Sequence, residues 1–338
     1  MPILLSHNTS LELLRSVPPQ IAGFKQSESD LPVERLGLWS GMSDYPFLQS
    51  LGISLLPVHF LVPSSKHQVK SRTCKLHRTH LESIPAGLVQ EIAPGIYAAG
   101  PELTFIQMAT TTSLVGAVVL GHELCGTYSH FARMASGFYE RPPLTSVESI
   151  KRAISSMKGM YGLARARQAL RWVRDGSASP METVISCMLH LPLEMGGAGR
   201  VAPELNWVVK LDRAAQRITG TKTCRIDTAY PSAKTGIEFD GKDYHRDKEK
   251  DRLRREAIAH MGWTIYVVDI DATTSYAELR KRIDLMDSIP QYGGGGEIDH
   301  DLGAALLDRL LHATRFGVGP NGTLFGVQVP AGSVKVHL

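Results

Sequence analysis

The sequence predicts an α/β fold, and three observations in its C-terminal half support this prediction. Two apolar runs, 224–230 and 235–240, are separated by a turn at 231–233 and have the length and residue types of strands. The charged segment 246–261 follows and has apolar residues at helical spacing, which predicts an amphipathic helix. After it, 263–268 (WTIYVV) is rich in bulky and β-branched residues and predicts another strand.

The composition is that of a soluble globular protein, and 338 residues are enough for two domains. The net charge of +4 does not by itself mark a nucleic-acid-binding protein, so such an argument depends on local patches. Cys74, Cys125, Cys187 and Cys224 lack CxxC spacing and predict reduced, packed thiols. The N-terminus is unlike a signal peptide, and no apolar stretch is long enough to span a bilayer. We therefore expect a cytoplasmic protein of bacterial type with no membrane partner.

Residues 1–141 predict an α+β N-terminal domain. The elements expected in it are a short helix at 10–16, a strand pair or one strand broken at Pro57 within 53–62, a strand at 95–99 and a helix at 101–109. No recognition helix of a winged-helix domain is evident in 1–50.

A basic cluster without acids, 66–80, lies in this domain. It fits a surface that faces nucleic acid, and equally a solvated strand and loop. Within it Cys74, His77 and His80 have a spacing that suggests metal ligands. A zinc site needs a fourth ligand, usually from a distant second pair, and no such pair is evident, so the spacing alone does not establish a metal site.

Residues 142–178 predict a basic helical connector, with two helices that break near 159–162. Arg167, Arg171 and Arg174 stand at positions i, i+4 and i+7 and are expected to share one face of the second helix. This face is either a solvated surface or an arm that contacts phosphates.

Residues 179–288 predict the domain that contains the strands described first. A helix at 179–191 and a strand at 206–212 precede those strands, so the predicted order is helix, three strands, helix and strand. A further helix at 276–287 closes this domain. Residues 289–338 then predict a Gly-rich linker, a helix at 299–316 and a tail.

Acidic residues occur inside two of the predicted strands. Side chains alternate along a strand, so Glu238 and Asp240 are expected to share one side of 235–240, and Asp227 faces away from its two neighbours. If the two strands are adjacent, the three carboxylates converge at one end of a sheet. Two carboxylates ~4 Å apart repel by about 4 kcal/mol at an effective dielectric near 20, so one is protonated or a cation is bound. Because Mg²⁺ (or Mn²⁺) prefers oxygen ligands and makes a bound water easier to deprotonate, the pattern predicts a metal-assisted hydrolytic site.

The residues around these acids also resemble a known family. The pattern R-x-D, then I-E-x-D-G-x-x-x-H, then D-R-x-R-x-x-x-I-x-x-x-G-W is similar to that of restriction-endonuclease-like domains related to the very-short-patch mismatch endonuclease, in the PD-(D/E)xK nuclease superfamily. The matching residues are Arg225, Asp227, Glu238, Asp240, Gly241, His245, Asp251, Arg254, Gly262 and Trp263, preceded by an S-P-x-E sequence at Ser179, Pro180, Met181 and Glu182. The resemblance covers 179–287 and implies a restriction-endonuclease-like αβββαβ core with a mixed sheet.

The sequence departs from the superfamily pattern at two places. No proline precedes Asp227, and Asp240 stands where the superfamily has its lysine. The very-short-patch branch also lacks that lysine and uses a nearby histidine, which makes His245 the candidate here.

The resemblance implies an Mg²⁺-dependent endonuclease that hydrolyses DNA phosphodiesters. It assigns the metal to Asp227, Glu238 and Glu182, places Asp240 in the same site, and makes His245 or a hydroxide on the metal the base. The residues expected to contact phosphate or DNA are Arg225, Lys242, Arg254, Arg167 and Arg171.

Each acid in this site also has a structural alternative. Asp227 and Glu238 could be strand-end acids paired with Arg225 or Arg254. Asp240 precedes a glycine, and Asp-Gly is an ordinary turn former. Glu182 could complete a capping box by accepting the backbone N–H of the N-cap residue.

The front half of the chain offers a second hypothesis for function. Its segments LLPVHFLVP, GIYAAGPELTFIQMA and LGHELCGTYSH weakly resemble regions of type IV abortive-infection antitoxins and related transcriptional regulators. On this hypothesis the protein is a non-catalytic DNA-binding regulator or antitoxin-like module with a degenerate nuclease fold, and it has a toxin or another defence protein as partner. A nuclease that acts on RNA is a third hypothesis.

Overall fold

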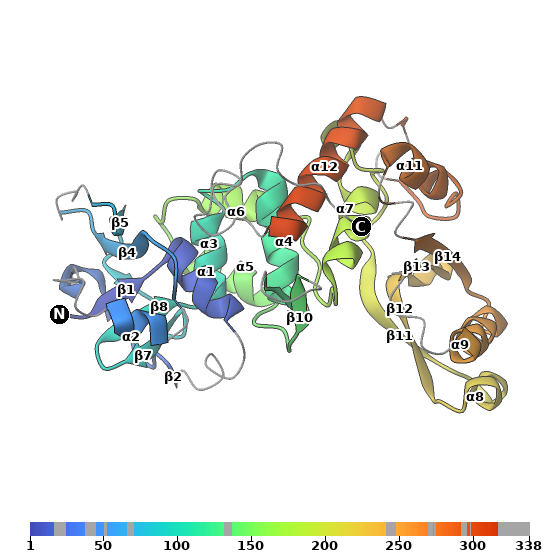
Figure 1. Cartoon of the computed structure of the whole chain (residues 1–338), viewed down its shortest axis with the longest axis horizontal. Coiled ribbons are helices and arrows are strands. Elements are labelled where there is room, and N and C mark those ends of the chain that lie inside the picture. Colours follow the sequence, from blue (N-terminus) through green and yellow to red (C-terminus); the bar gives the residue numbers. More distant parts are fainter. Residues whose placement is uncertain are drawn as a thin grey trace. The chain divides into compact units, whose positions relative to one another are not determined.

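The computed structural model describes residues 1–16, 25–37, 45–50, 53–65, 71–131, 137–240, 248–269, 273, 275–291, 296–297 and 299–316. It confirms a mixed α/β protein with mixed sheets (Figure 1). Of the described residues, the N-terminal unit comprises 1–124, 129–173 and 315–316, and the C-terminal unit comprises 125–128 and 174–314. The division between 173 and 174 falls inside the stretch that the sequence suggests as a connector. The predicted tail, 317–338, lies outside the described residues.

The N-terminal unit contains a six-stranded mixed sheet. Its strands are β1 (Ile3–Leu5), β2 (Lys25–Gln26), β4 (Val58–Pro63), β5 (Cys74–Thr79), β7 (Val89–Ala93) and β8 (Ile96–Ala99), in the order β2-β7-β8-β1-β4-β5. Strand β1 runs parallel to β8 and antiparallel to β4, and β4 runs parallel to β5. Two short pairs join β3 (Leu31–Pro32) to β6 (Ser83–Ile84) and β9 (Tyr128–His130) to β10 (Phe138–Glu140).

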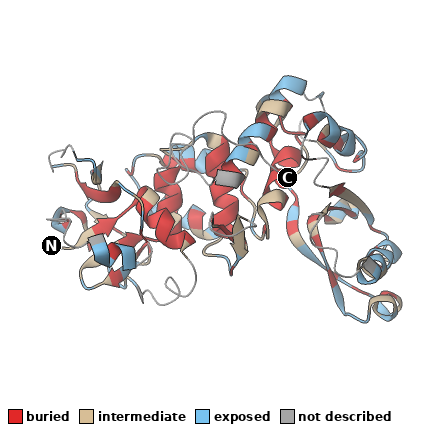
Figure 2. Cartoon of the chain, viewed as in Figure 1, coloured by how far each residue is buried: buried red, intermediate tan, exposed pale blue. Residues whose placement is uncertain are grey.

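Six helices are described in this unit besides the strands. They are α1 (His7–Arg15), α2 (Tyr45–Ser50), α3 (Pro101–Met108), α4 (Leu114–Cys125), α5 (Val147–Ser156) and α6 (Leu163–Leu170), with a 3₁₀ turn at Val33–Arg35. Helices α3 and α4 are almost entirely buried (Figure 2), because their sequences are apolar on nearly every side. No helix in the described part of the chain combines the length and the apolar character needed to cross a membrane.

Two element boundaries in this unit differ from the sequence prediction. Helix α1 begins at His7 rather than at residue 10, and Ser6 occupies the N-cap position. Strand β4 begins at Val58, directly after Pro57, and 53–57 form no strand. A proline lacks the N–H that a sheet interior requires, which explains why the strand starts after it.

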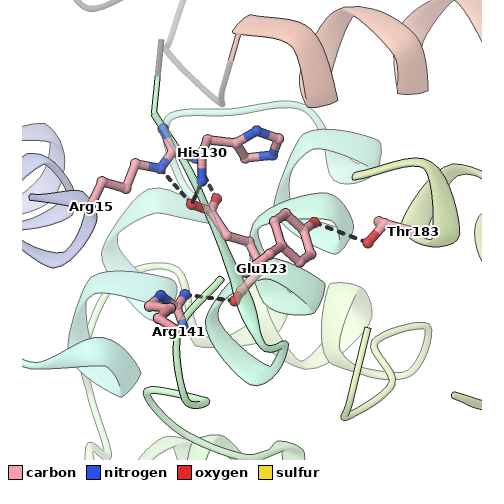
Figure 3. A network of polar contacts seen from close by, with 6 residues as sticks. Arg15, Glu123, His130, Arg141 and Thr183 are labelled. Carbon is pink, nitrogen blue, oxygen red and sulfur yellow. Dashed lines mark hydrogen bonds and ion pairs between the residues drawn. The ribbon is translucent and has the colours of Figure 1, made fainter. Parts of the chain in front are cut away.

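A buried ion pair connects α1 and α4 within the N-terminal unit (Figure 3). Arg15 Nε donates to Glu123 Oε1 at 2.8 Å, and Arg15 Nη2 donates to Glu123 Oε2. The backbone N–H of His130 also donates to Oε1, at 3.1 Å, and Arg141 Nη2 donates to the backbone carbonyl of Glu123 at 2.8 Å. Burial would raise the pKa of Glu123, but the charge and hydrogen bonds of Arg15, together with His130 and Arg141, lower it to about 2. Glu123 is therefore ionised at neutral pH although it is fully buried.

A four-stranded mixed sheet forms the centre of the C-terminal unit. Its strands β11 (Glu204–Lys210), β12 (Thr223–Tyr230), β13 (Thr235–Asp240) and β14 (Thr264–Asp269) lie in that order. Neighbouring strands are antiparallel except for the parallel pair β13 and β14. The helices are α7 (Pro180–His190), α8 (Arg213–Thr219), α9 (Lys248–His260), α11 (Tyr276–Asp284) and α12 (His300–Phe316), with 3₁₀ turns at Leu193–Met195 and Pro231–Ala233. The elements follow the predicted order of helix, three strands, helix and strand, with α8 inserted between β11 and β12.

The packing of this sheet fixes the positions of its acidic residues. Two neighbouring parallel strands must be joined by a crossover connection, and α9 forms part of this connection between β13 and β14. Helix α9 contributes Ala257 and Ile258 to a core that also contains Ile226 of β12. A Cβ on Gly236 would lie 2.6 Å from side-chain carbons of both Ile226 and Ile265, so only glycine permits this close approach. Gly236 therefore lets the side chains of Ile226 and Ile265 pack over β13 beside the point where the acids occur.

Candidate functional site

Glu182 lies in the first turn of α7 and is nearly buried, with 8% of its surface exposed. The N-cap predicted from S-P-x-E is confirmed, because Ser179 Oγ accepts the N–H of Glu182 at 3.2 Å. The reciprocal bond of the capping box differs from the prediction. Glu182 Oε2 accepts the N–H of Ala178 at 2.8 Å, not that of Ser179. The carboxylate is thus fixed at the N-terminal end of α7.

Asn206 on β11 is a neighbour of Glu182 that sequence reasoning missed. Its Nδ2 donates to Glu182 Oε2 and to the backbone carbonyl of Gly176, both at 2.8 Å. The backbone of Asn206 has a φ of 51°, a left-handed conformation that asparagine adopts more readily than most residues. The available signal was an amide inside an otherwise apolar strand sequence, because a polar side chain there needs a partner.

Asp227 lies on β12, one residue before the stretch that pairs with β13 through Thr228 and Ile237. Its Oδ2 accepts the backbone N–H of Phe239 at 3.1 Å. This bond places the carboxylate of Asp227 against β13, next to the position of Glu238. The two strands that carry the acids are therefore adjacent, as expected.

Glu238 on β13 is paired with Arg254 of α9. Arg254 Nη1 donates to Glu238 Oε1 and Nη2 to Oε2, both at 2.7 Å, which is the two-pronged geometry typical of strong guanidinium–carboxylate pairs. Arg254 Nη1 also donates to the backbone carbonyl of Arg225 at 2.9 Å. The Glu238 side chain is 5% exposed and that of Arg254 is 31% exposed, so the guanidinium lies on the solvent side of the pair.

The pKa values of the three carboxylates are all raised, and the charge of Asp227 contributes to two of these shifts. Burial raises the pKa of Glu182, and the negative charge of Asp227 raises it further, to about 7. The pKa of Asp227 is raised mainly by burial. Burial also raises the pKa of Glu238, Arg254 opposes this and the charge of Asp227 adds to it. Asp227 thus acts on both glutamates, and we call Glu182, Asp227 and Glu238 the acidic cluster.

The raised pKa of Glu182 predicts that the protein becomes less stable as the pH rises from about 4.5 to about 7. The folded state keeps the proton over this range and the unfolded state releases it, so the folded state loses stability. With a shift of this size the loss is on the order of 3 kcal/mol. Urea denaturation of the wild type and Glu182→Gln, followed across this range, checks the prediction. The variant should lack this part of the pH dependence, and equal slopes for both proteins would contradict the assignment.

The other predicted site residues fall into three groups. Arg225 is exposed on β12, and its charge acts on Asp227. Asp240 is the last residue of β13 and lies opposite Asp269 in the parallel register. His245 and Lys242 lie outside the described residues.

The predicted arginine face on the second connector helix is only partly present. Arg167 lies in α6, Arg171 is its C-cap residue, and both are exposed in the N-terminal unit. Because α6 ends at Leu170, Arg174 does not continue this face, and that part of the prediction is wrong. Arg174 belongs to the C-terminal unit, where its Nη2 lies 2.6 Å from His190 Nε2.

The spacing of Cys74, His77 and His80 does not assemble a metal site. His77 Nε2 lies 3.0 Å from Nδ1 of His59 on β4, and its ring stacks on that of His7 with centroids 3.4 Å apart. Among the residues that the structure describes, no three His, Cys, Asp or Glu side chains are grouped so that they could hold a metal ion. This statement includes the acidic cluster, in which Arg254 occupies both oxygens of Glu238.

No family model, curated protein or solved structure matches this chain significantly.

Proposed function

We propose that this protein is a metal-dependent nuclease. More specifically, we propose that it is an endonuclease that hydrolyses DNA phosphodiesters, and that its active site lies in a restriction-endonuclease-like core in the C-terminal unit. The observation that supports this most is the acidic cluster itself. Three carboxylates from α7, β12 and β13 interact electrostatically, of which Glu182 and Glu238 are buried and Asp227 is half-buried. Such an arrangement is costly without a compensating cation and is typical of functional sites.

A divalent cation suits the charge of this cluster, although its side chains are not grouped as a complete metal site in the described residues. Within the described residues, the hydrogen bonds to the carboxylates of Glu182 and Asp227 come from uncharged donors, namely backbone amides, Asn206 and Ser179. The negative charge that raises the pKa of Glu182 is what a hard cation with oxygen ligands would relieve. Glu182 and Asp227 would hold the ion, with Glu238 as a further ligand. When bound there, Mg²⁺ would withdraw charge from the phosphate and make a water molecule easier to deprotonate.

The basic residues next to the cluster suit a phosphate substrate. Arg254 and Arg225 place positive charge on the solvent side of the acids, where a backbone phosphate would approach. His245 follows β13 by five residues and remains the candidate for accepting the proton from the attacking water.

A non-catalytic DNA-binding module is the second candidate, and the Glu238–Arg254 pair favours it. A guanidinium bonded to both oxygens neutralises Glu238 without any metal ion, as expected of a nuclease fold that has lost its chemistry. On this alternative, Glu182 simply stays protonated at and below its raised pKa.

Calorimetric titration with Mn²⁺ separates these two functions. For the nuclease we expect the full-length wild type to bind Mn²⁺, and Asp227→Asn to weaken binding by at least about tenfold, because an amide is a much poorer ligand for a hard cation. Glu249→Gln is the matched control, since Glu249 is an exposed carboxylate whose partner is Arg252 on the same helix. Absence of Mn²⁺ binding by the wild type would leave the non-catalytic module as the function.

A further inference from the structure

We infer that Arg254 is an exchangeable counterion of Glu238. It holds this carboxylate while nucleic acid is absent, and it moves to a backbone phosphate when nucleic acid binds, which frees Glu238 for the metal ion. This inference rests on the proposed function and adds a property to it. Metal and nucleic acid should bind cooperatively, and each should bind weakly without the other.

The contacts of Glu238 show that a metal ion and Arg254 compete for it. Each carboxylate oxygen accepts a hydrogen bond from one guanidinium nitrogen at 2.7 Å, so both oxygens are bonded to Arg254. Glu238 is 4% exposed as a residue, so a metal ion at the same oxygens would lie close to the guanidinium. Two positive charges at this distance would also repel each other. The metal ion can therefore gain Glu238 as a ligand only if Arg254 leaves.

Arg254, rather than Glu238, is the partner that can move. Glu238 lies on β13, which is hydrogen-bonded to β12 on one side and β14 on the other. Arg254 projects from α9 on a long side chain that is partly exposed to solvent. Its third hydrogen bond goes to the backbone carbonyl of Arg225, which is a neutral acceptor. Leaving Glu238 therefore breaks one ion pair and one neutral hydrogen bond.

A phosphate is the partner best suited to receive Arg254. The planar guanidinium bonds to two phosphate oxygens in the same two-pronged way as to a carboxylate, so the exchange replaces one ion pair by another. Arg225 and Arg255 also act electrostatically on Asp227 and Glu238, which concentrates positive charge around this point. If Arg254 moved to a phosphate while no metal ion was bound, the Glu238 carboxylate would be buried without a positive partner, which is strongly unfavourable. The two binding events are therefore coupled.

The first test is Mn²⁺ titration of the full-length protein without nucleic acid, at about pH 8, where Glu182 has lost its proton. We expect Arg254→Gln to bind Mn²⁺ about tenfold more tightly than the wild type, because Glu238 no longer has a competing cation. Arg252→Gln removes the same charge from the same helix, but Arg252 pairs with Glu249 and Glu256, so this control should bind like the wild type. If Arg254→Gln binds no more tightly than a metal-binding wild type, the exchange is overturned and the proposed function stands. If neither protein binds Mn²⁺, both fail.

The second test measures the coupling from the nucleic-acid side. Fluorescence anisotropy of a labelled short DNA duplex gives its affinity with and without Mn²⁺ at constant ionic strength. We expect Mn²⁺ to tighten duplex binding by the wild type about tenfold, since coupling between two ligands is reciprocal. Asp227→Asn lacks a ligand of the proposed site and reports the effect of Mn²⁺ on the DNA itself. An equal effect of Mn²⁺ on Arg254→Gln, Asp227→Asn and the wild type would overturn the exchange.

Discussion

Asp227→Asn is expected to abolish Mg²⁺-dependent nicking of supercoiled plasmid DNA, with a loss of about 10³-fold or more. Asp227 is the member of the acidic cluster that acts on both other carboxylates, so its charge contributes to any cation held there. Metal ions contribute several kcal/mol to transition states of this kind, and each 1.4 kcal/mol or so corresponds to tenfold in rate. Gel assays at saturating Mg²⁺, with an RNA transcript as a second substrate, measure the loss and also show which nucleic acid is cleaved.

The same substitution should not destabilise the fold, which distinguishes a lost ligand from a misfolded protein. Asparagine retains an oxygen that can accept the N–H of Phe239, as Asp227 Oδ2 does at 3.1 Å. Because burial raises the pKa of Asp227, its ionised form is unfavourable in the folded protein, and a neutral amide should be tolerated or slightly stabilising. We therefore expect an unchanged or higher melting temperature together with lost nicking. Nicking at the wild-type rate by Asp227→Asn would remove Asp227 from the mechanism, and a fall in melting temperature would make the activity loss uninformative.

The local pattern of the chain predicts the order of elements in the C-terminal unit well. Helix α9 and strands β12, β13 and β14 begin and end within about two residues of the predicted ranges, because their periodicity and flanking turns are local properties. The N-cap of α7 was predictable for the same reason, since Ser179 bonds an N–H only three residues away.

Contacts between distant parts of the chain could not be predicted in this way. The sequence offers both Arg225 and Arg254 as partners of Glu238, and only the packing of α9 against the sheet selects Arg254. Asn206 reaches Glu182 from 24 residues away, through a left-handed backbone conformation that periodicity does not reveal. The prediction of an arginine face was wrong because it assumed that the helix continues to Arg174, whereas α6 ends at Leu170. Spacing identifies which residues can share a face only as long as the helix continues.

Arg15→Met is expected to lower the free energy of unfolding by about 3–5 kcal/mol, the largest stability effect that we predict. Arg15 and Glu123 are 108 residues apart in sequence, and their side chains are 4% and 1% exposed. Removing Arg15 leaves the Glu123 carboxylate buried without the guanidinium that bonds both of its oxygens. Urea denaturation measures the loss, and hydrogen exchange of peptides from α1 and α4 assigns it to the N-terminal unit. Arg252→Met, which removes an exposed arginine, should leave the unfolding free energy nearly unchanged.

The double variant Arg15→Met/Glu123→Leu and the pH dependence show whether charge is the cause. Two apolar side chains of similar size need no compensation, so the double variant should recover most of the stability that the single variant loses. The folded-state pKa of Glu123, about 2, lies below its unfolded value near 4.5. Its contribution is therefore fully present above about pH 4.5 and is lost as the pH falls towards about 2. The wild type should lose stability over this range, and the double variant should lose less. If the double variant is no more stable than Arg15→Met, packing around Arg15, rather than the buried charge, determines the stability of this contact.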